Sequence, residues 1–351
     1  MKKTGVALWC SWLVLLVALS VTADTVEDLQ AATVPVADQG APALAGAARE
    51  ALAEVLVKVS GTRELLQNPT IVEALADARN HVQQYAYVSG KAPGEGLSVR
   101  FEFDAGYIRD LVTRAGAPLW TANRPLVLAW VVVEDEQGRH FINWESTPEQ
   151  AQLLADEFSR RGVPVQLPVF DLVDTAAVAP EDVWRLDAGA VQAASTRYNV
   201  QDVVVARLAS PAGAQATGDW SYLYQDRRVN SSVTAPDLQA FLRDGVNVVA
   251  ATMSARYAVA PTAAVDGGVR MSVAGVSSYT DYAAIVSWLE GLELVQYANL
   301  ERVQGDRIEL RLQAQADAAQ LAAIIELNNR FELLPLPVSG STAQLNYQWR
   351  N

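Results

Sequence analysis

Near the middle of the chain, residues 126–133 form an uninterrupted apolar run. Strict alternation of apolar and polar residues is typical of a strand with one buried face, whereas a continuous apolar run fits a strand buried on both faces. Pro118, Trp120 and Pro125 precede the run and restrict the backbone that leads into it. We therefore expect a rigid junction followed by the central strand of a domain.

The segment before this run, residues 24–119, alternates helical and strand patterns. Apolar positions recur at helical spacing from Leu44 to Val59, and Gly61 suits a left-handed helix end. Residues 97–103 alternate apolar and polar side chains, as in a strand with one wet face. The pattern predicts a small α+β N-terminal domain.

Strand and helix patterns also alternate through residues 120–260, which predicts a central α/β domain with a mostly parallel sheet. Residues 261–351 follow the order strand, helix, strand, strand, helix, strand, with one further strand at the end. This order predicts a C-terminal ferredoxin-like α+β domain. The expected fold class is thus a multidomain chain that combines α/β and α+β domains.

The N-terminus has the pattern of a secretory signal. Lys2 and Lys3 precede an apolar core at residues 6–19, and small residues end at Ala23. The core is shorter than the roughly 20 residues that a membrane-spanning helix needs. We expect residues 1–23 to be a signal peptide cleaved after Ala23. The mature protein would then be periplasmic, with no retained transmembrane helix.

The amino-acid composition limits the kinds of reaction, metal site and partner that the mature chain could have. The single cysteine, Cys10, lies in the predicted signal, which excludes disulfides and thiolate chemistry from the mature chain. Loss of Lys2 and Lys3 shifts the formal net charge from −13 to −15, which disfavours nucleic acid as a partner. The two histidines, His81 and His140, lie far apart in the sequence and disfavour a zinc site. We expect no cofactor. Because the sequence contains no catalytic constellation, it favours a protein without enzymatic activity but does not exclude an enzyme.

Several separated blocks carry a resemblance to a known family. They are the helix end at Ser60-Gly61, Asn68, Tyr85 with Tyr87, Phe101-Glu102-Phe103-Asp104, residues 115–120 and Arg124-Pro125. On these blocks the chain resembles an uncharacterised exported family of gammaproteobacteria, catalogued as domain of unknown function 2066. No activity is established for that family, so the resemblance implies none here.

Acidic residues follow the second predicted strand of the central domain. Open α/β sheets bind ligands beyond the carboxyl ends of their strands, where these residues are expected. The candidates are Asp171, Asp174, Asp182 and Asp187, with Trp184 among them. They would form either a solvated acidic loop, or a ligand site in which Trp184 stacks on the ligand and paired carboxylates act as acid and base.

A second candidate surface is aromatic. Trp220, Tyr222 and Tyr224 alternate along a predicted strand, so their rings share one face. They would either pack in the core beneath the following helix, or form an exposed face that stacks on sugars or receives a partner.

Three functions remain open at this point. The first is a non-enzymatic binding or assembly factor of the cell envelope, whose partner is another envelope protein or an envelope glycan. The second is a periplasmic solute- or glycan-binding protein that uses the acidic crevice. The third is a carboxylate-dependent hydrolase.

Overall fold

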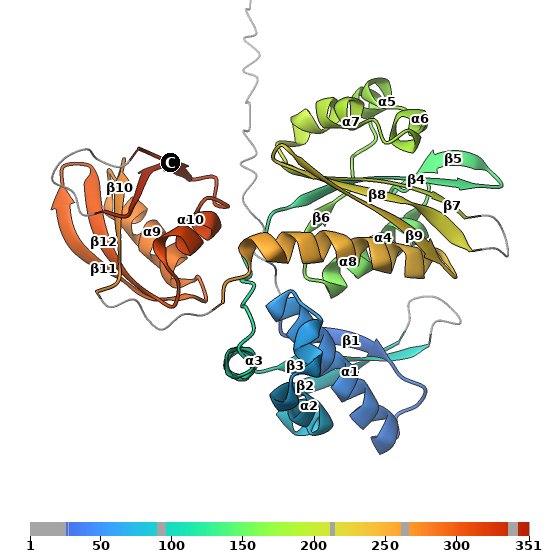
Figure 1. Cartoon of the computed structure of the whole chain (residues 1–351), viewed down its shortest axis with the longest axis horizontal. Coiled ribbons are helices and arrows are strands. Elements are labelled where there is room, and N and C mark those ends of the chain that lie inside the picture. The colour runs from blue at the N-terminus through green and yellow to red at the C-terminus, as the bar shows by residue number, and fades with distance from the viewer. Residues whose placement is uncertain are drawn as a thin grey trace, which may run out of the picture.

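The computed structural model describes residues 26, 28–89, 96–210, 215–260, 267–335 and 343–350. The predicted signal peptide, residues 1–23, and its cleavage point lie outside these ranges. Three sheets organise the described chain, and Figure 1 shows each with its own helices. Of the helices in the described ranges, none has both the length and the apolar character that a bilayer crossing requires.

The N-terminal sheet is antiparallel and has the order β1-β3-β2. Its strands and the helices around them are β1 (Ala31–Pro35), α1 (Ala41–Ser60), η1 (Glu64–Gln67), α2 (Pro69–Ala76), η2 (Ala78–His81), β2 (Val82–Ser89), β3 (Leu97–Phe103) and α3 (Ala105–Arg114). The side chains of Asn68 and Asp104 cap the starts of α2 and α3 by accepting backbone N–H groups. Gly61 ends α1 in the left-handed conformation, at a φ of 78°.

The central sheet has the order β5-β4-β7-β8-β9, with β6 also paired to β4. Its elements are β4 (Val127–Asp135), β5 (Gly138–Phe141), α4 (Pro148–Arg160), β6 (Val165–Gln166), α5 (Leu172–Ala177), α6 (Pro180–Trp184), α7 (Ala188–Ser195), η3 (Thr196–Tyr198), β7 (Asp202–Ala209), β8 (Ala216–Tyr224), β9 (Arg227–Ala235) and α8 (Leu238–Tyr257). Strand β4 runs parallel to β6 and β7, whereas the β4–β5, β7–β8 and β8–β9 pairs are antiparallel. The turn at Gln225-Asp226 predicts the antiparallel β8–β9 pair, but the antiparallel β4–β5 and β7–β8 pairs make the sheet mixed rather than mostly parallel.

Strand β4 lies at the centre of a three-layer arrangement, visible in Figure 1. On one face, alternate residues from Val127 to Val133 pack with α4 and α8. On the other, Leu128, Trp130 and Val132 pack with α6 and α7. Every residue from 127 to 133 is at most 1% exposed, which confirms the prediction of a strand buried on both faces.

The C-terminal sheet has the order β11-β12-β10-β14-β13. Its elements are β10 (Val269–Ala274), α9 (Tyr279–Glu290), β11 (Val295–Gln304), β12 (Arg307–Ala314), α10 (Ala318–Ile325), β13 (Phe331–Leu333) and β14 (Leu345–Trp349). The expected order of strands and helices is present, but β14 lies between β10 and β13, where a ferredoxin-like fold pairs the first strand with the fourth. The buried rings of Tyr347 and Trp349 pack against Phe331, so the last strand is held inside the sheet.

The junction, residues 119–124, forms hydrogen bonds with helices or loops that belong to the parts of the chain around each of the three sheets. Trp120 N donates to Val59 O at the end of α1 (2.7 Å), and Leu119 forms a two-way bridge with Val259 after α8. Ala122 N donates to the Glu293 carboxylate (2.8 Å). Asn123 Nδ2 donates to Ile324 O in α10 (3.0 Å). Hydrogen bonds therefore hold this segment to the end of α1, to α10 and to the residues that follow α8 and α9. This agrees with the rigid junction expected from its prolines and tryptophan.

Arg124 is fully buried at the centre of the junction, with its guanidinium 3.7 Å from the centre of the Trp120 ring. It donates five hydrogen bonds of 2.7–3.2 Å to main-chain oxygens, those of Lys58, Trp120, Thr121, Arg161 and Gly162. One of these oxygens, that of Lys58, lies in the last turn of α1, where helical carbonyls lack partners within the helix, and those of Arg161 and Gly162 lie directly after α4. Burial lowers the pKa of Arg124.

Lys58 adds a second buried cation beside Arg124. Its ammonium donates to Ala31 O (2.8 Å) and lies 3.9 Å from Glu54, and the residue is 6% exposed. Burial lowers the pKa of Lys58 from 10.5 to about 8. Between these two pH values the unfolded chain binds the proton that the folded chain has lost, so the Lys58 contribution to stability rises with pH.

We expect the free energy of unfolding of the wild type to rise relative to that of Lys58→Met as the pH increases from about 8 toward 10.5. The change follows from the shift in pKa and is on the order of 3 kcal/mol over the full interval. Urea unfolding of both proteins at pH 7.0 and at about pH 9.5 measures the part of this change that falls below pH 9.5, about 2 kcal/mol. A constant difference between the two proteins across this range would contradict the assignment.

Candidate functional site

The acidic segment after β6 contains two helices, α5 and α6, where the sequence predicts a loop, whereas the helix predicted at about residues 188–198 is present as α7 and η3. Three short helices, α5, α6 and α7, follow one another there and cover one face of the central sheet. Asp171 accepts the N–H groups of Val173 and Asp174 at the start of α5. Asp187 does the same for Gly189 and Ala190 at the start of α7. These aspartates are helix caps, a role that stabilises a helix start.

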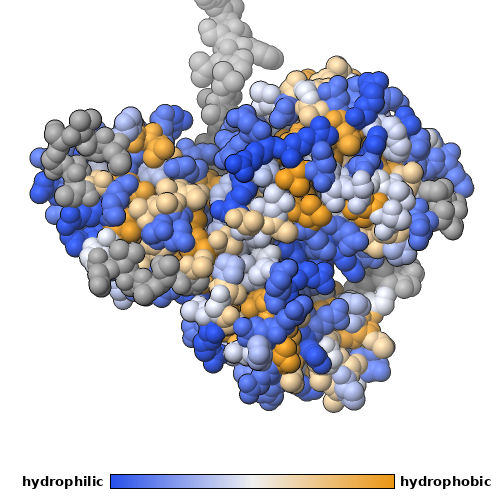
Figure 2. All heavy atoms as spheres, in the orientation of Figure 1, coloured by the Kyte–Doolittle hydropathy of each residue, from blue (hydrophilic) through white to orange (hydrophobic). Residues whose placement is uncertain are grey.

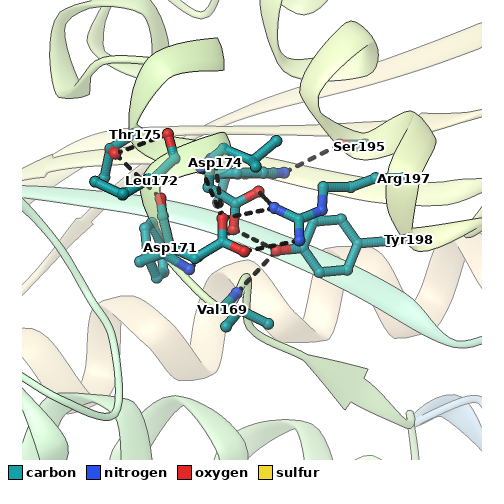
Figure 3. A network of polar contacts seen from close by, with 11 residues as sticks. Val169, Asp171, Leu172, Asp174, Thr175, Ser195, Arg197 and Tyr198 are labelled. Carbon is teal, nitrogen blue, oxygen red and sulfur yellow. Dashed lines mark hydrogen bonds and ion pairs between the residues drawn. The ribbon is translucent and has the colours of Figure 1, made fainter. Parts of the chain in front are cut away.

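Asp171 is also paired with Arg197, as Figure 3 shows. Arg197 Nη1 and Nη2 donate to the two carboxylate oxygens at 2.6 and 2.8 Å, a bidentate arrangement. The pairing with Arg197 holds the pKa of Asp171 well below its usual range and raises that of Arg197. An ionised carboxylate of this kind has no proton to donate as a general acid near neutral pH.

Asp174 lies beneath this pair and is 1% exposed. Its carboxylate accepts hydrogen bonds from Arg197 Nη1 (3.0 Å), from Phe170 N (2.9 Å) and from the Tyr198 hydroxyl. The same hydroxyl accepts the N–H of Val169 at 2.8 Å. Burial, reinforced by the bond to Asp174, raises the pKa of Tyr198 to about 12. The network in Figure 3 therefore fixes the backbone of residues 169–174.

Asp182 and Trp184 also make contacts within the protein that stabilise the fold. Asp182 accepts Ala179 N (3.0 Å) and Arg185 Nη2 (2.6 Å), and the bond from Ala179 N is the larger cause of its lowered pKa. The half-buried Trp184 ring lies 4.3 Å from the Arg139 guanidinium and packs against the core. Across the described ranges, no group of three or more His, Asp or Glu side chains is placed to hold a metal ion.

The aromatic candidates lie on the opposite face of the sheet. Trp220 and Tyr222 are 1% exposed and Tyr224 is 7% exposed, and all three pack in the cluster formed with α8. Tyr222 donates its hydroxyl to buried Asp202, which also accepts Arg256 Nη1 at 2.9 Å. The structure thus does not bring the acidic and aromatic candidates together. It places the rings in the core.

One family model matches the chain. It describes a domain of unknown function (DUF8605) and covers residues 23–121. The match spans the N-terminal sheet, less than a third of the chain. No curated protein and no solved structure matches the sequence significantly.

This match overturns the resemblance to the family numbered 2066, which is a different domain of unknown function. The structure explains why the quoted blocks misled. Gly61, Asn68 and Asp104 act as helix caps, and Phe101 and Phe103 are core residues of β3. Such caps and apolar alternations recur in many small α+β domains, so they identify a kind of local structure rather than one family.

Three exposed apolar side chains lie beside this hydrogen-bond network, and they were not predicted as a surface from the sequence. Val169 is 65%, Leu172 87% and Val173 59% exposed, within and just before the first turn of α5. Figure 2 shows apolar side chains among charged ones over the α5–α7 layer. The adjacent pair Leu172-Val173 directly after a capping aspartate was the available signal. We call Val169, Leu172 and Val173 the apolar tip.

A shallow hollow of about 330 Å³ lies beside the start of β4. Leu126, Trp144, Ala155, Val165, Gln166 and Leu167 line it. Trp144 is 51% exposed, and the turn that presents it is fixed by the Asn143 side chain, which accepts Glu145 N and Ser146 N at 2.9 and 2.7 Å. A rigidly presented tryptophan in the wall of a hollow is the kind of surface on which a ligand ring stacks.

Proposed function

We propose that the chain is exported to the periplasm by cleavage after Ala23 and acts there as a non-enzymatic binding or assembly protein. The basic and apolar pattern of residues 1–23 supports export. We further propose three domains, at residues 24–119, 120–260 and 261–351, with an α+β, an α/β and a ferredoxin-like character. The three separate sheets support this layout.

The observation that carries the proposal is the apolar tip. The carboxylates around it are occupied by helix caps and ion pairs, while three aliphatic side chains face solvent. Burying such a side chain contributes about 1.5–3 kcal/mol. Because the Asp171–Arg197–Asp174 network already fixes the backbone, little ordering entropy opposes binding. We therefore propose that the tip inserts into an apolar groove of another envelope protein.

Photo-cross-linking tests this proposal. With a photoreactive amino acid in place of Leu172, we expect one discrete cross-linked species from intact envelopes. Tyr297 offers a matched control, because it is a large exposed side chain (61%) on β11, far from the tip in the fold. Leu172→Asp should abolish co-purification of the captured protein while the thermal stability of the chain stays unchanged.

Three outcomes would count against the tip. A species captured equally from positions 172 and 297, or co-purification that survives Leu172→Asp, would show that the tip is not the contact. Capture of nothing, together with a rise in melting temperature on adding glycan fragments that Trp144→Ala removes, would favour the solute- or glycan-binding alternative at the hollow. The hydrolase alternative has less support, since Asp171, Asp174, Asp182 and Asp187 are all engaged in internal hydrogen bonds.

A further inference from the structure

Strand β2 is an unusual sheet edge. It forms one side of the N-terminal sheet, and in the part of the chain that the structure describes it pairs only with β3. Its eight residues include no charge, no proline and no glycine. The one register shift lies between Val82 and Gln84, so the strand is regular from Tyr85 onward. Regular, uncharged, exposed edges readily pair with another strand.

The other edges in the described ranges each carry a feature that opposes such pairing. Strand β1 is short, mostly buried and ends at Pro35; β5, β6 and β13 have four, two and three residues; β9 begins with Arg227 and Arg228; β11 contains Glu301, Arg302 and two register shifts. Short length, charge, proline and bulges are the known means of protecting an edge. Only β2, among these edges, lacks them along most of its length.

The face of β2 on the helix side is also incompletely covered. Tyr85 and Tyr87 lie opposite Phe101 and Val99 of β3, both buried beneath the helices. Helix α1 packs on β1 and β3. The two tyrosine rings are nevertheless 50% and 36% exposed. The apolar layer therefore continues beyond the edge of the helices, where an added strand would extend it.

We propose that β2 pairs in antiparallel fashion with β2 of a second copy of this chain. With Ala86 opposite Ala86, each Tyr85 faces Tyr87 of the other copy, and aromatic cross-strand pairs of this kind are stabilising. A two-fold axis through this point keeps both α1 helices on one side of a six-stranded sheet. Copies of the chain that begins at Asp24, each with a formal net charge of −15 once Lys2 and Lys3 are lost, repel one another, so contact is favoured at an edge with no charges of its own.

The concentration dependence of mass in sedimentation equilibrium tests the pairing on the chain that begins at Asp24. We expect a monomer–dimer equilibrium for the wild type. Ala86→Lys and Ala86→Glu place like charges opposite each other and should each weaken dimerisation roughly fivefold or more. An equimolar mixture of the two variants should restore it. Val303→Lys, at an exposed position (60%) on the protected edge β11, should have no effect.

A monomeric wild type at all concentrations would overturn the proposal, as would a dimer that neither Ala86 variant weakens. If β2 instead cross-links to a different envelope protein while the chain stays monomeric, the second copy is the wrong occupant. Should an Ala86 variant misfold, hydrogen exchange of the wild type decides the matter: β2 amides gain protection with concentration only if they pair between copies.

Discussion

Replacing Arg124 with methionine is expected to lower the free energy of unfolding by about 3–5 kcal/mol, the usual cost of removing one side of a buried polar set. The substitution keeps apolar volume but leaves five main-chain oxygens without their donor. These include the Lys58 carbonyl in the last turn of α1 and the carbonyls of Arg161 and Gly162 directly after α4. The stacking of the guanidinium on Trp120 is lost as well.

Urea unfolding at neutral pH measures the loss, and limited proteolysis between residues 116 and 126 should be faster in the variant. Arg124→Lys should recover only a small part, because one ammonium cannot reach oxygens that a planar guanidinium spans. Arg302→Met serves as the control, since the Arg302 side chain is 61% exposed and its ion pair with Glu309 is long (3.8 Å). A loss below about 1 kcal/mol for Arg124→Met would reduce the junction to an ordinary linker.

At the junction, the sequence predicts the buried strand but not the contacts of the buried arginine. The apolar run of residues 126–133 was sufficient to predict β4 and its burial, because continuous hydrophobicity is a local property. The importance of Arg124 was not visible, because its partners include Lys58, Arg161 and Gly162, far from it in sequence. Likewise, the insertion of β14 between β10 and β13 depends on pairing across the chain.

At the candidate site, too, the local pattern could be predicted from the sequence, but the pairings between distant residues could not. The sequence was sufficient to locate the acidic segment, but it did not show which groups its aspartates pair with. Arg197 pairs with Asp171 from 26 residues away, and that pairing turns acid–base candidates into helix anchors. The pair Leu172-Val173 after a capping aspartate was the signal in the sequence, but apolar residues at a helix start also fit a buried position, so only their exposure in the structure identified the apolar tip.

Trp220→Ala is expected to lower the free energy of unfolding by about 3–5 kcal/mol, the range for truncating a large buried aromatic residue. Trp220 packs against Phe241, with ring centres 5.9 Å apart, and lies over Gly245 of α8. A Cβ atom at position 245 would lie 1.9 Å from Trp220 Cε2, so the ring occupies the space that this glycine leaves open. Gly245→Ala should therefore also destabilise the chain, by about 1–3 kcal/mol.

Conservative replacement separates a core role from a ligand role for this ring. Its indole nitrogen is buried without a hydrogen-bond partner, so Trp220→Phe loses volume but no polar contact and should cost less than Trp220→Ala. Trp144→Ala, at a half-exposed ring, should change stability little. Thermal and urea unfolding of the four variants measure the order. If Trp220→Ala left stability unchanged but reduced binding of a sugar or partner, the ring would belong to a recognition surface, and its burial beneath α8 would have to open in solution.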